Sequence, residues 1–309
     1  MPSLYNRDIL DGAQFTREDL DCIMDLADDF RRQLERPASL DLLRGYVLAT
    51  LFFEPSTRTR LSFETAMHRL GGAVVGFSSA ESTSVAKGET LADTIRTVDQ
   101  YADLIAMRHP AIGSARLAAE VARAPVFNGG DGAGQHPTQA LLDLYTIRSE
   151  RKRLEGVTIA LCGDLKHGRT VHSGVEIYRH YPCHLVFVSP EALRMPAEIS
   201  MRLRAEGVEF EETEDLALAM RKADVLYMTR IQKERFTDPA EYERLKGCYV
   251  VNRGMIEALN PRLTVMHPLP RVNEIDTDVD DTDNAAYFRQ MRNGVYVRMA
   301  LLALVAGKA

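Results

Sequence analysis

The chain has 309 residues, 45% of them hydrophobic, and a formal net charge of −6, which fits one large globular domain or two moderate ones. This acidic balance argues against nucleic acid as the main partner. No apolar run reaches membrane length and residues 1–10 lack a signal-peptide core, so no membrane partner is expected. The four cysteines lack metal-ligand spacing and are expected to be reduced core thiols of a cytoplasmic protein.

Hydrophobic periodicity predicts alternating helices and strands in the first part of the chain. Helices are expected at 16–36, 61–70 and 89–101, and strands at 46–53, 73–77, 104–107 and 125–128. Residues 78–88 are small and polar, and their composition alone favours a mobile loop. The glycine-dense residues 129–134 predict a turn before the next helix, at 137–153. Because Pro137 is tolerated at a first helical position, His136 is expected at the cap.

The turn at residues 54–60, between a predicted strand and a predicted helix, has the features of an anion site. Ser56 or Thr57 is expected to cap the helix and to leave free backbone N–H groups at its start. Arg58 and Arg60 lie in or beside that first turn, where the helix dipole disfavours positive charge. Two arginines in such a place predict that a phosphate binds there.

A second series of strands predicts a second domain. Its strands are expected at 157–162, 184–188, 225–228, 249–252 and 263–266, with 207–212 as a candidate edge strand and a long apolar helix at 289–306. Strands that alternate with helices imply parallel sheets covered on both faces. We therefore expect an α/β protein with two doubly wound domains joined by long helices. The first would span 1–137 and be completed by 290–309, and the second would span 138–289.

Cations and imidazoles follow strand after strand. Those at equivalent strand ends are Arg58, Arg108, His136, Arg169, Arg230, and His267 with Arg271. Ligands of parallel open sheets bind beyond the carboxyl ends of the strands. This distribution predicts a cleft between the domains that binds a small, multiply anionic set of ligands.

Two segments refine this prediction. Residues 163–170 resemble a phosphate-binding P-loop, except that Arg169 stands where a lysine belongs. A P-loop-like nucleotide-binding enzyme is therefore one alternative, although no acidic strand end is evident that would hold Mg²⁺. Residues 229–235 place three cations and an amide after a strand, and the planar forks of two arginines suit a dicarboxylate.

Taken together, these segments resemble the catalytic chain of the aspartate carbamoyltransferase family, within the aspartate/ornithine carbamoyltransferase superfamily. The matching motifs occur in family order at 53–60, 86–90, 107–110, 135–139, 168–173, 228–235 and 267–271. The resemblance extends from about Tyr5 to the last helix. The segments at 229–235 and 267–270 favour aspartate over ornithine, and a carbamoyltransferase for another amine remains an alternative.

The resemblance implies transfer of the carbamoyl group from carbamoyl phosphate to L-aspartate, in de novo pyrimidine biosynthesis, with no cofactor and no metal. Carbamoyl phosphate would be bound by Ser56, Thr57, Arg58, Thr59, Ser84, Arg108, His136, Gln139 and the backbone of Leu269 and Pro270. Aspartate would be bound by Lys87, Arg169, Arg230 and Gln232. Catalysis would depend on Arg58, Thr59, Lys87, Arg108 and His136. The two domains would be linked on closure by Glu54, Arg169 and Arg235.

The resemblance also implies a homotrimer whose active sites are shared between chains. In the family, Ser84 and Lys87 come from the neighbouring subunit. The loop at 78–88 is a residue shorter than in some relatives and has a single lysine before Gly88, so Lys87 is the candidate for this role. Whether regulatory chains or a dihydroorotase also associate is left open.

Overall fold

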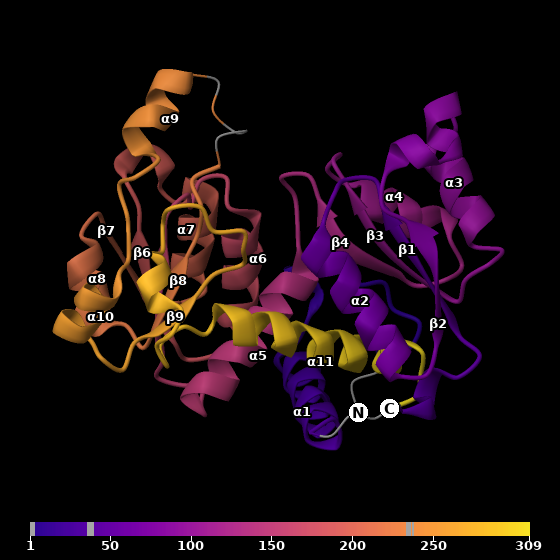
Figure 1. Cartoon of the computed structure of the whole chain (residues 1–309), viewed down its shortest axis with the longest axis horizontal. Coiled ribbons are helices and arrows are strands. Elements are labelled where there is room, and N and C mark those ends of the chain that lie inside the picture. Colours follow the sequence, from indigo (N-terminus) through magenta and orange to yellow (C-terminus); the bar gives the residue numbers. More distant parts are fainter. Residues whose placement is uncertain (1–3, 36–39, 233–235, 237) are drawn as a thin grey trace. The chain divides into compact units, whose positions relative to one another are not determined.

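The computed structural model describes residues 4–35, 40–232, 236 and 238–309 (Figure 1). The chain divides into two compact units. Unit 1 comprises Met1–Tyr145 and Met291–Ala309, and unit 2 comprises Thr146–Gln290. The boundaries fall within α5 (Pro137–Arg151) and α11 (Tyr287–Val305), so each of these helices contributes residues to both units.

Unit 1 is built on a four-stranded sheet in the order β2-β1-β3-β4, whose pairings are all parallel. Its strands are β1 (Val47–Phe52), β2 (Ala73–Phe77), β3 (Leu104–His109) and β4 (Val126–Asp131). Its longer helices are α1 (Arg17–Gln33), α2 (Thr57–Arg69), α3 (Leu91–Val98) and α4 (Ser114–Val121). Short 3-10 helices are η1 (Gly12–Gln14), η2 (Asp41–Leu43), η3 (Ala80–Ser82) and η4 (Ser84–Lys87).

Strands β1, β3 and β4 of this sheet are mostly buried, whereas β2 is largely exposed, and alternate strand residues point to opposite faces of the sheet. Leu51 of β1 packs in one cluster with Ile95 of α3 and Ala115 of α4. On the opposite face, the ring of Phe127 in β4 lies 5.9 Å from that of Phe63 in α2. The carboxyl end of β1 therefore leads directly into a helix that packs back on the same sheet.

Unit 2 holds a five-stranded sheet in the order β7-β6-β5-β8-β9, again with parallel pairings. Its strands are β5 (Thr158–Cys162), β6 (His184–Val188), β7 (Phe210–Thr213), β8 (Val225–Met228) and β9 (Thr264–Met266). Its helices are α6 (Arg169–Tyr178), α7 (Ala197–Ala205), α8 (Leu216–Lys222), α9 (Pro239–Leu245) and α10 (Arg253–Leu259), with 3-10 helices η5 (Glu191–Leu193) and η7 (Thr277–Val279).

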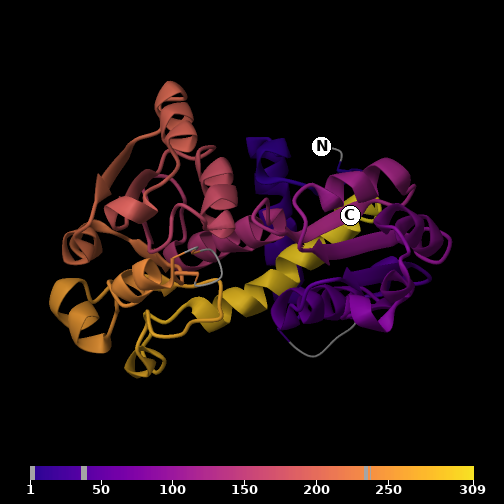
Figure 2. The same ribbon diagram turned by 90° about the horizontal axis from the view of Figure 1, so that it is seen from above.

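The sheet of unit 2 is also covered on both sides. Met220 of α8 and Ile256 of α10 pack against Ala160 and Leu226 of the central strands. The helices α6 and α7 lie on the other side of the sheet, as both views show (Figures 1 and 2). Two parallel sheets flanked by helices confirm the predicted α/β class.

Some predicted elements differ from the structure. Residues 249–252 are predicted to form a strand, but only Val251 pairs, in an isolated bridge with Ile275. The backbone of Val251 bonds to residues 274 and 276 and not to a strand of the sheet. Gly129 and Gly130 continue β4, so the predicted turn is shorter. Residues 78–88 contain η3 and η4, which begin where the hydroxyls of Ser79 and Thr83 accept backbone N–H groups. The candidate edge strand is confirmed as β7.

The cysteines are free thiols, but not all of them lie in the core. Cys162 and Cys183 are buried, Cys22 is half-buried and Cys248 is exposed. Burial raises the pKa of Cys183 to about 11. None of the helices in the described ranges combines the length and the apolar character needed to cross a membrane.

Candidate active site

The start of α2 carries the first group of predicted site residues. Ser56 occupies the N-cap with extended backbone (φ −156°), although its side chain makes no capping hydrogen bond. The helix begins at Thr57, which confirms the predicted cap at Ser56, and Arg58 and Thr59 both lie in its first turn. The first N–H groups of a helix have no intrahelical acceptor, and they attract negative charge.

Arg108 lies beside this turn, near the end of the neighbouring strand β3. Its Nη2 atom donates to Oε1 of Glu54 at 2.5 Å, and Nη1 donates to the carbonyl of Gly129 at 3.2 Å. Burial and the positive charge of Arg108 lower the pKa of Arg58. The charges of the two arginines therefore act on each other at a helix start, and such a place suits an anion.

His136 reaches the same place from β4. The carboxylate of Asp131 accepts the N–H of Gln135 at 2.6 Å and that of Gly113 at 2.9 Å, which fixes the turn before His136. His136 is the residue before α5, and its side chain is buried. Its Nε2 atom lies 3.5 Å from the hydroxyl of Thr59. The strand ends of unit 1 thus bring an imidazole to the arginine-rich turn.

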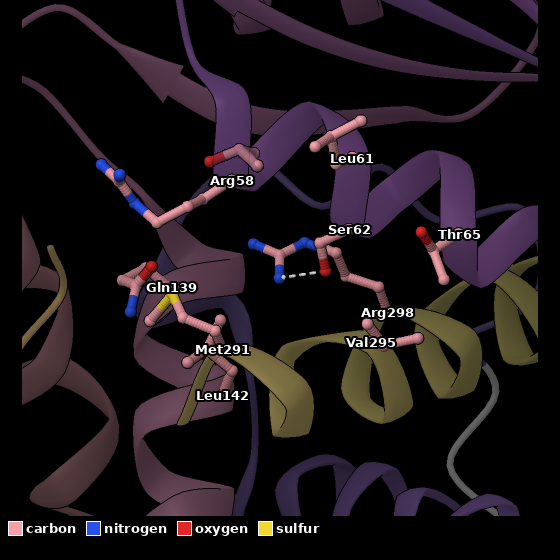
Figure 3. A pocket seen from close by; sticks show the side chains of 10 residues that line it. Arg58, Leu61, Ser62, Thr65, Gln139, Leu142, Met291, Val295 and Arg298 are labelled. Carbon is pink, nitrogen blue, oxygen red and sulfur yellow. Dashed lines mark hydrogen bonds between the residues drawn. The ribbon is translucent and has the colours of Figure 1, made fainter. Parts of the chain in front are cut away.

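A pocket of about 200 Å³ opens between α2 and the parts of α5 and α11 that belong to unit 1 (Figure 3). Its lining includes Arg58, Thr59, Gln139 and, from α11, Arg298. The Nε2 atom of Gln139 donates to the buried carboxylate of Asp143 at 2.8 Å. This bond points the carbonyl oxygen of the Gln139 amide away from Asp143, where it can accept a hydrogen bond from an N–H donor.

In unit 2, the turn between β5 and α6 holds Arg169. Gly163 at its start has φ +122°, and a Cβ atom there would lie 2.3 Å from the carbonyl oxygen of Thr229, so only glycine fits. Arg169 is the first residue of α6. The buried carboxylate of Asp164 accepts the N–H of His167 at 3.0 Å, so part of this P-loop-like turn is already bonded to an acid.

The end of β8 lies next to this turn, because β5 and β8 are neighbours in the sheet. The Nε2 atom of Gln232 donates to the carbonyl of His167 at 3.4 Å. Arg230 precedes it by two residues and is half-buried. The amide of Gln232 and the turn that ends at Arg169 therefore meet beyond the carboxyl ends of β5 and β8. Arg230 also follows β8.

The segment after β9 has an unusual backbone. The Leu269–Pro270 bond is cis and Leu269 has φ +55°. The N–H of Leu269 donates to Nδ1 of His267 at 2.7 Å, so Nε2 carries the proton and donates to Glu274 at 2.7 Å. Arg271 is bonded to Asp280 and to the hydroxyl of Tyr287. Arg271, which the strand-end pattern included, is thus neutralised inside unit 2.

Three predicted site residues stand apart. Ser84 and Lys87 lie on η4 with exposed side chains, and neither forms a side-chain hydrogen bond or ion pair within the described part of the chain. Arg235 lies outside the described residues. The structure therefore groups Glu54, Ser56–Thr59, Arg108, His136 and Gln139 in unit 1, and Arg169, Arg230 and Gln232 in unit 2.

Comparison with known families finds a match for each of the two parts of the chain. Residues 7–149 match the model of the aspartate/ornithine carbamoyltransferase carbamoyl-P binding domain, and residues 155–305 match the Asp/Orn binding domain of the same family. The chain belongs to the aspartate/ornithine carbamoyltransferase family. The two matches contain all of the site residues predicted from the sequence.

Individual family members agree closely along the whole chain. The aspartate carbamoyltransferase catalytic subunit of Thermococcus kodakarensis is 58% identical over 301 residues, which cover 97% of each chain. The catalytic subunit of M. jannaschii aspartate transcarbamoylase superposes with a TM-score of 0.90 at 50% identity, over 96% of each chain. Aspartate transcarbamoylase from Trypanosoma cruzi, in complex with carbamoyl phosphate and aspartate, gives a TM-score of 0.93 at 44% identity, covering 98% of this chain and 97% of that one.

Two structural features of this family member were missed by the sequence reasoning. One is the buried pair of His267 and Glu274, whose bond supports the backbone at Leu269. The other is Arg298, a buried cation in the pocket wall. A signal for Arg298 was present in the sequence, because it is the one charged residue between 293 and 307. No sequence spacing indicates that Glu274 returns to His267.

Proposed function

We propose that the chain transfers the carbamoyl group of carbamoyl phosphate to the amine of L-aspartate, which yields N-carbamoyl-L-aspartate and phosphate. The observation that carries the proposal is the cluster at the start of α2, where Thr59 meets His136 and Arg58 neighbours Arg108. The cluster occurs in a chain 58% identical to an aspartate carbamoyltransferase catalytic subunit. The reaction belongs to de novo pyrimidine biosynthesis.

Carbamoyl phosphate binds mainly to residues of unit 1 in this proposal, and Leu269 and Pro270 of unit 2 complete its site. Its phosphate accepts hydrogen bonds from Ser56, Thr57, Arg58, Thr59 and Arg108, and from Ser84 of a neighbouring chain. Its carbamoyl group meets His136 and Gln139, with the backbone of Leu269 and Pro270. Support comes from the helix start and from the two arginines whose charges act on each other there, both of which favour a bound dianion.

Aspartate is held by Arg169, Arg230 and Gln232, with Lys87 of the neighbouring chain. Support comes from the carboxyl ends of β5 and β8, beyond which Gln232 contacts the turn that ends at Arg169. Two guanidinium groups suit two carboxylates because each offers a planar pair of donors. The proposed closing contacts of Glu54 with Arg169 and Arg235 remain predictions, and Glu54 bonds to Arg108 within unit 1.

The chemistry is a direct displacement through a tetrahedral intermediate. The aspartate nitrogen attacks the carbamoyl carbon, and the carbonyl π electrons move to its oxygen. Thr59, Arg108 and His136 stabilise that oxyanion through hydrogen bonds that are set before the reaction. The oxyanion then re-forms the carbonyl, the C–O bond to phosphate breaks, and the departing phosphate accepts the proton of the amine. Binding both substrates in attack geometry supplies much of the remaining rate.

The proposed assembly is a cytoplasmic homotrimer with active sites shared between chains. The exposed side chains of Ser84 and Lys87 support this arrangement, because they are available to a neighbouring chain. Native mass spectrometry of protein purified from its source would reveal a trimer, and would also reveal any regulatory chain or dihydroorotase by its added mass.

The activity is tested by initial rates with carbamoyl phosphate and either L-aspartate or L-ornithine. We expect N-carbamoyl-L-aspartate and phosphate to form in equal amounts, with ornithine giving a rate near the background. Preference for ornithine would reassign the acceptor. ATP hydrolysis without carbamoyl transfer would instead support the nucleotide-binding alternative.

A further inference from the structure

Arg298 is a fully buried cation in the last helix of unit 1. It lies in an otherwise apolar stretch of α11 and is only 2% exposed. Burial lowers its pKa to about 10, against a raising effect from the charge of Asp143. The guanidinium therefore remains charged at neutral pH, although removing it from water is unfavourable.

The guanidinium is bonded to uncharged groups on three helices. Its Nη1 atom donates to the hydroxyl of Ser62 in α2 at 3.0 Å and to the carbonyl of Gly294 at 3.2 Å. Its Nη2 atom donates to the hydroxyl of Thr138 in α5 at 3.1 Å. It also stacks over the ring of Phe63 at 5.0 Å. Figure 3 shows the bond to Ser62 and the Arg58 side chain directed away from it.

The two hydroxyl partners lie close in sequence to the site. Ser62 is four residues after Arg58, and Thr138 is two residues after His136. One side chain thus ties together the two helices whose first residues form the candidate site. The surrounding chain makes room for it, because a Cβ atom at Gly294 would lie 2.7 Å from Nη1 of Arg298.

Stability alone does not account for this arrangement. Replacing a buried charge by an apolar side chain of similar volume is often neutral or stabilising. Met291, Val295 and Leu142 line the same pocket and show that apolar side chains fit there. A buried arginine that holds fixed hydrogen-bond angles does, however, set the relative placement of α2 and α5.

We propose that Arg298 is a positioning residue for carbamoyl transfer. Through Ser62 it holds the phosphate-binding turn at the start of α2, and through Thr138 it holds the start of α5, where His136 meets the carbamoyl oxygen. The inference rests on the proposed function. The bond to Ser62 supports the turn that binds the phosphate, and the bond to Thr138 supports the residue that meets the carbamoyl oxygen. Loss of one bond should therefore have a different kinetic effect from loss of the other.

The test uses full-length protein with Ser62→Ala, Thr138→Val, Arg298→Met and Arg298→Lys. Ser62→Ala should weaken binding of inorganic phosphate about fivefold and lower kcat by less than Thr138→Val does, because only the bond to α2, which carries the phosphate anchors, is lost. Thr138→Val should lower kcat about tenfold and leave the Kd of phosphate within about twofold. Arg298→Met should show both the weaker phosphate binding and the lower kcat. Arg298→Lys should recover part of only one of these two effects relative to Arg298→Met, since an ammonium lacks the planar fork of a guanidinium.

Ser200→Ala is the matched control, because it removes a hydroxyl that is buried in unit 2 and has no hydrogen-bond partner among the described residues. It should change neither constant. The proposal is overturned if Arg298→Met keeps the wild-type kcat and the wild-type Kd of phosphate, or if Ser62→Ala and Thr138→Val change these two constants in the same way. It is also overturned if, across the variants, each change in kcat or Kd is proportional to the decrease in melting temperature. If wild-type protein shows no carbamoyl transfer, the proposed function is refuted instead. Calorimetry with inorganic phosphate would then still measure the effect of Ser62→Ala on phosphate binding.

Discussion

The Nε2 atom of His136 lies 3.5 Å from the hydroxyl of Thr59, and both side chains are buried. This contact joins the first turn of α2 to the residue that precedes α5. In the proposed mechanism, this imidazole stabilises the carbonyl oxygen of a substrate bound at the α2 start.

His136→Ala should lower kcat by about 10²–10³, the usual cost of losing one preorganised donor. In the proposed mechanism His136 donates a hydrogen bond and the leaving phosphate accepts the proton, so the pH profile of kcat should keep its shape. Rates measured between pH 6 and 9 would check this. Disappearance of one limb of the profile in the variant would identify His136 as a general base.

Arg230→Ala should raise the KM for aspartate and lower kcat, with the Kd of carbamoyl phosphate nearly unchanged. The reason is that the anchors of the two substrates belong to different units in the proposal, Arg230 to unit 2 and Arg58 to unit 1. Steady-state kinetics and calorimetry would measure the two effects separately. Equal weakening of both substrates would show that the assignment of anchors is wrong.

The sequence predicted the order of most strands and the residues that follow them, because apolar runs and strand-end cations are visible along the chain. The cap at Ser56 was predicted from the hydroxyl residues at 56 and 57, although Thr57–Arg60 are polar and the apolar period of α2 begins only at Leu61. The run at 249–252 was predicted as a strand because an apolar run does not reveal which backbone groups it bonds to.

Other parts of the site depend on contacts between distant segments. Arg298 reaches Ser62 across 236 positions of sequence, and no local pattern encodes that pairing. Likewise, the strand-end position of Arg271 suggested an anion anchor, but Asp280 folds back to neutralise it. Local chemistry therefore predicted the residues at strand ends, and tertiary packing decided which of their charges are satisfied within the chain.

The buried pair of Glu274 and His267 should make stability depend on acid pH. Burial acts to raise the pKa of Glu274, but the bond from His267 and the backbone N–H groups outweigh it and lower this pKa below 4.5. A lowered folded-state pKa gives stability that is present above the unfolded value and is lost as the pH falls through the folded value.

Glu274→Gln should therefore be less stable than wild type at pH 7, and the difference should shrink below about pH 4.5. Urea unfolding at a series of pH values would measure it. Glu257→Gln is the control, because this exposed partner of Arg253 should contribute little. A difference for Glu274→Gln that is constant from pH 7 to pH 3 would contradict the lowered pKa.

Subunit mixing tests the shared site. Arg58→Ala and Lys87→Ala should each give an inactive homotrimer, because each lesion affects all three sites. After dissociation, mixing and reassembly, every mixed trimer has one interface where an intact Arg58 meets an intact Lys87. Equal random mixing leaves about three-quarters of the trimers mixed, so activity should return to roughly a quarter of wild type.

If both residues served one site from the same chain, no mixture would restore an intact site. Mass spectrometry must confirm that mixed trimers have formed. Activity that stays at the level of the single variants in confirmed mixed trimers would rule out the shared site.

The most direct test of the account is the binding of a bisubstrate analogue that carries a phosphonate and two carboxylates, measured by calorimetry. We expect it to bind wild type at least about 10²-fold more tightly than phosphate, because one molecule engages the anchors of both substrates. Arg58→Ala and Arg230→Ala should each remove much of that gain. An analogue that binds no more tightly than phosphate, or that binds Arg230→Ala as well as wild type, would contradict the assignment of this chain as an aspartate-specific carbamoyltransferase.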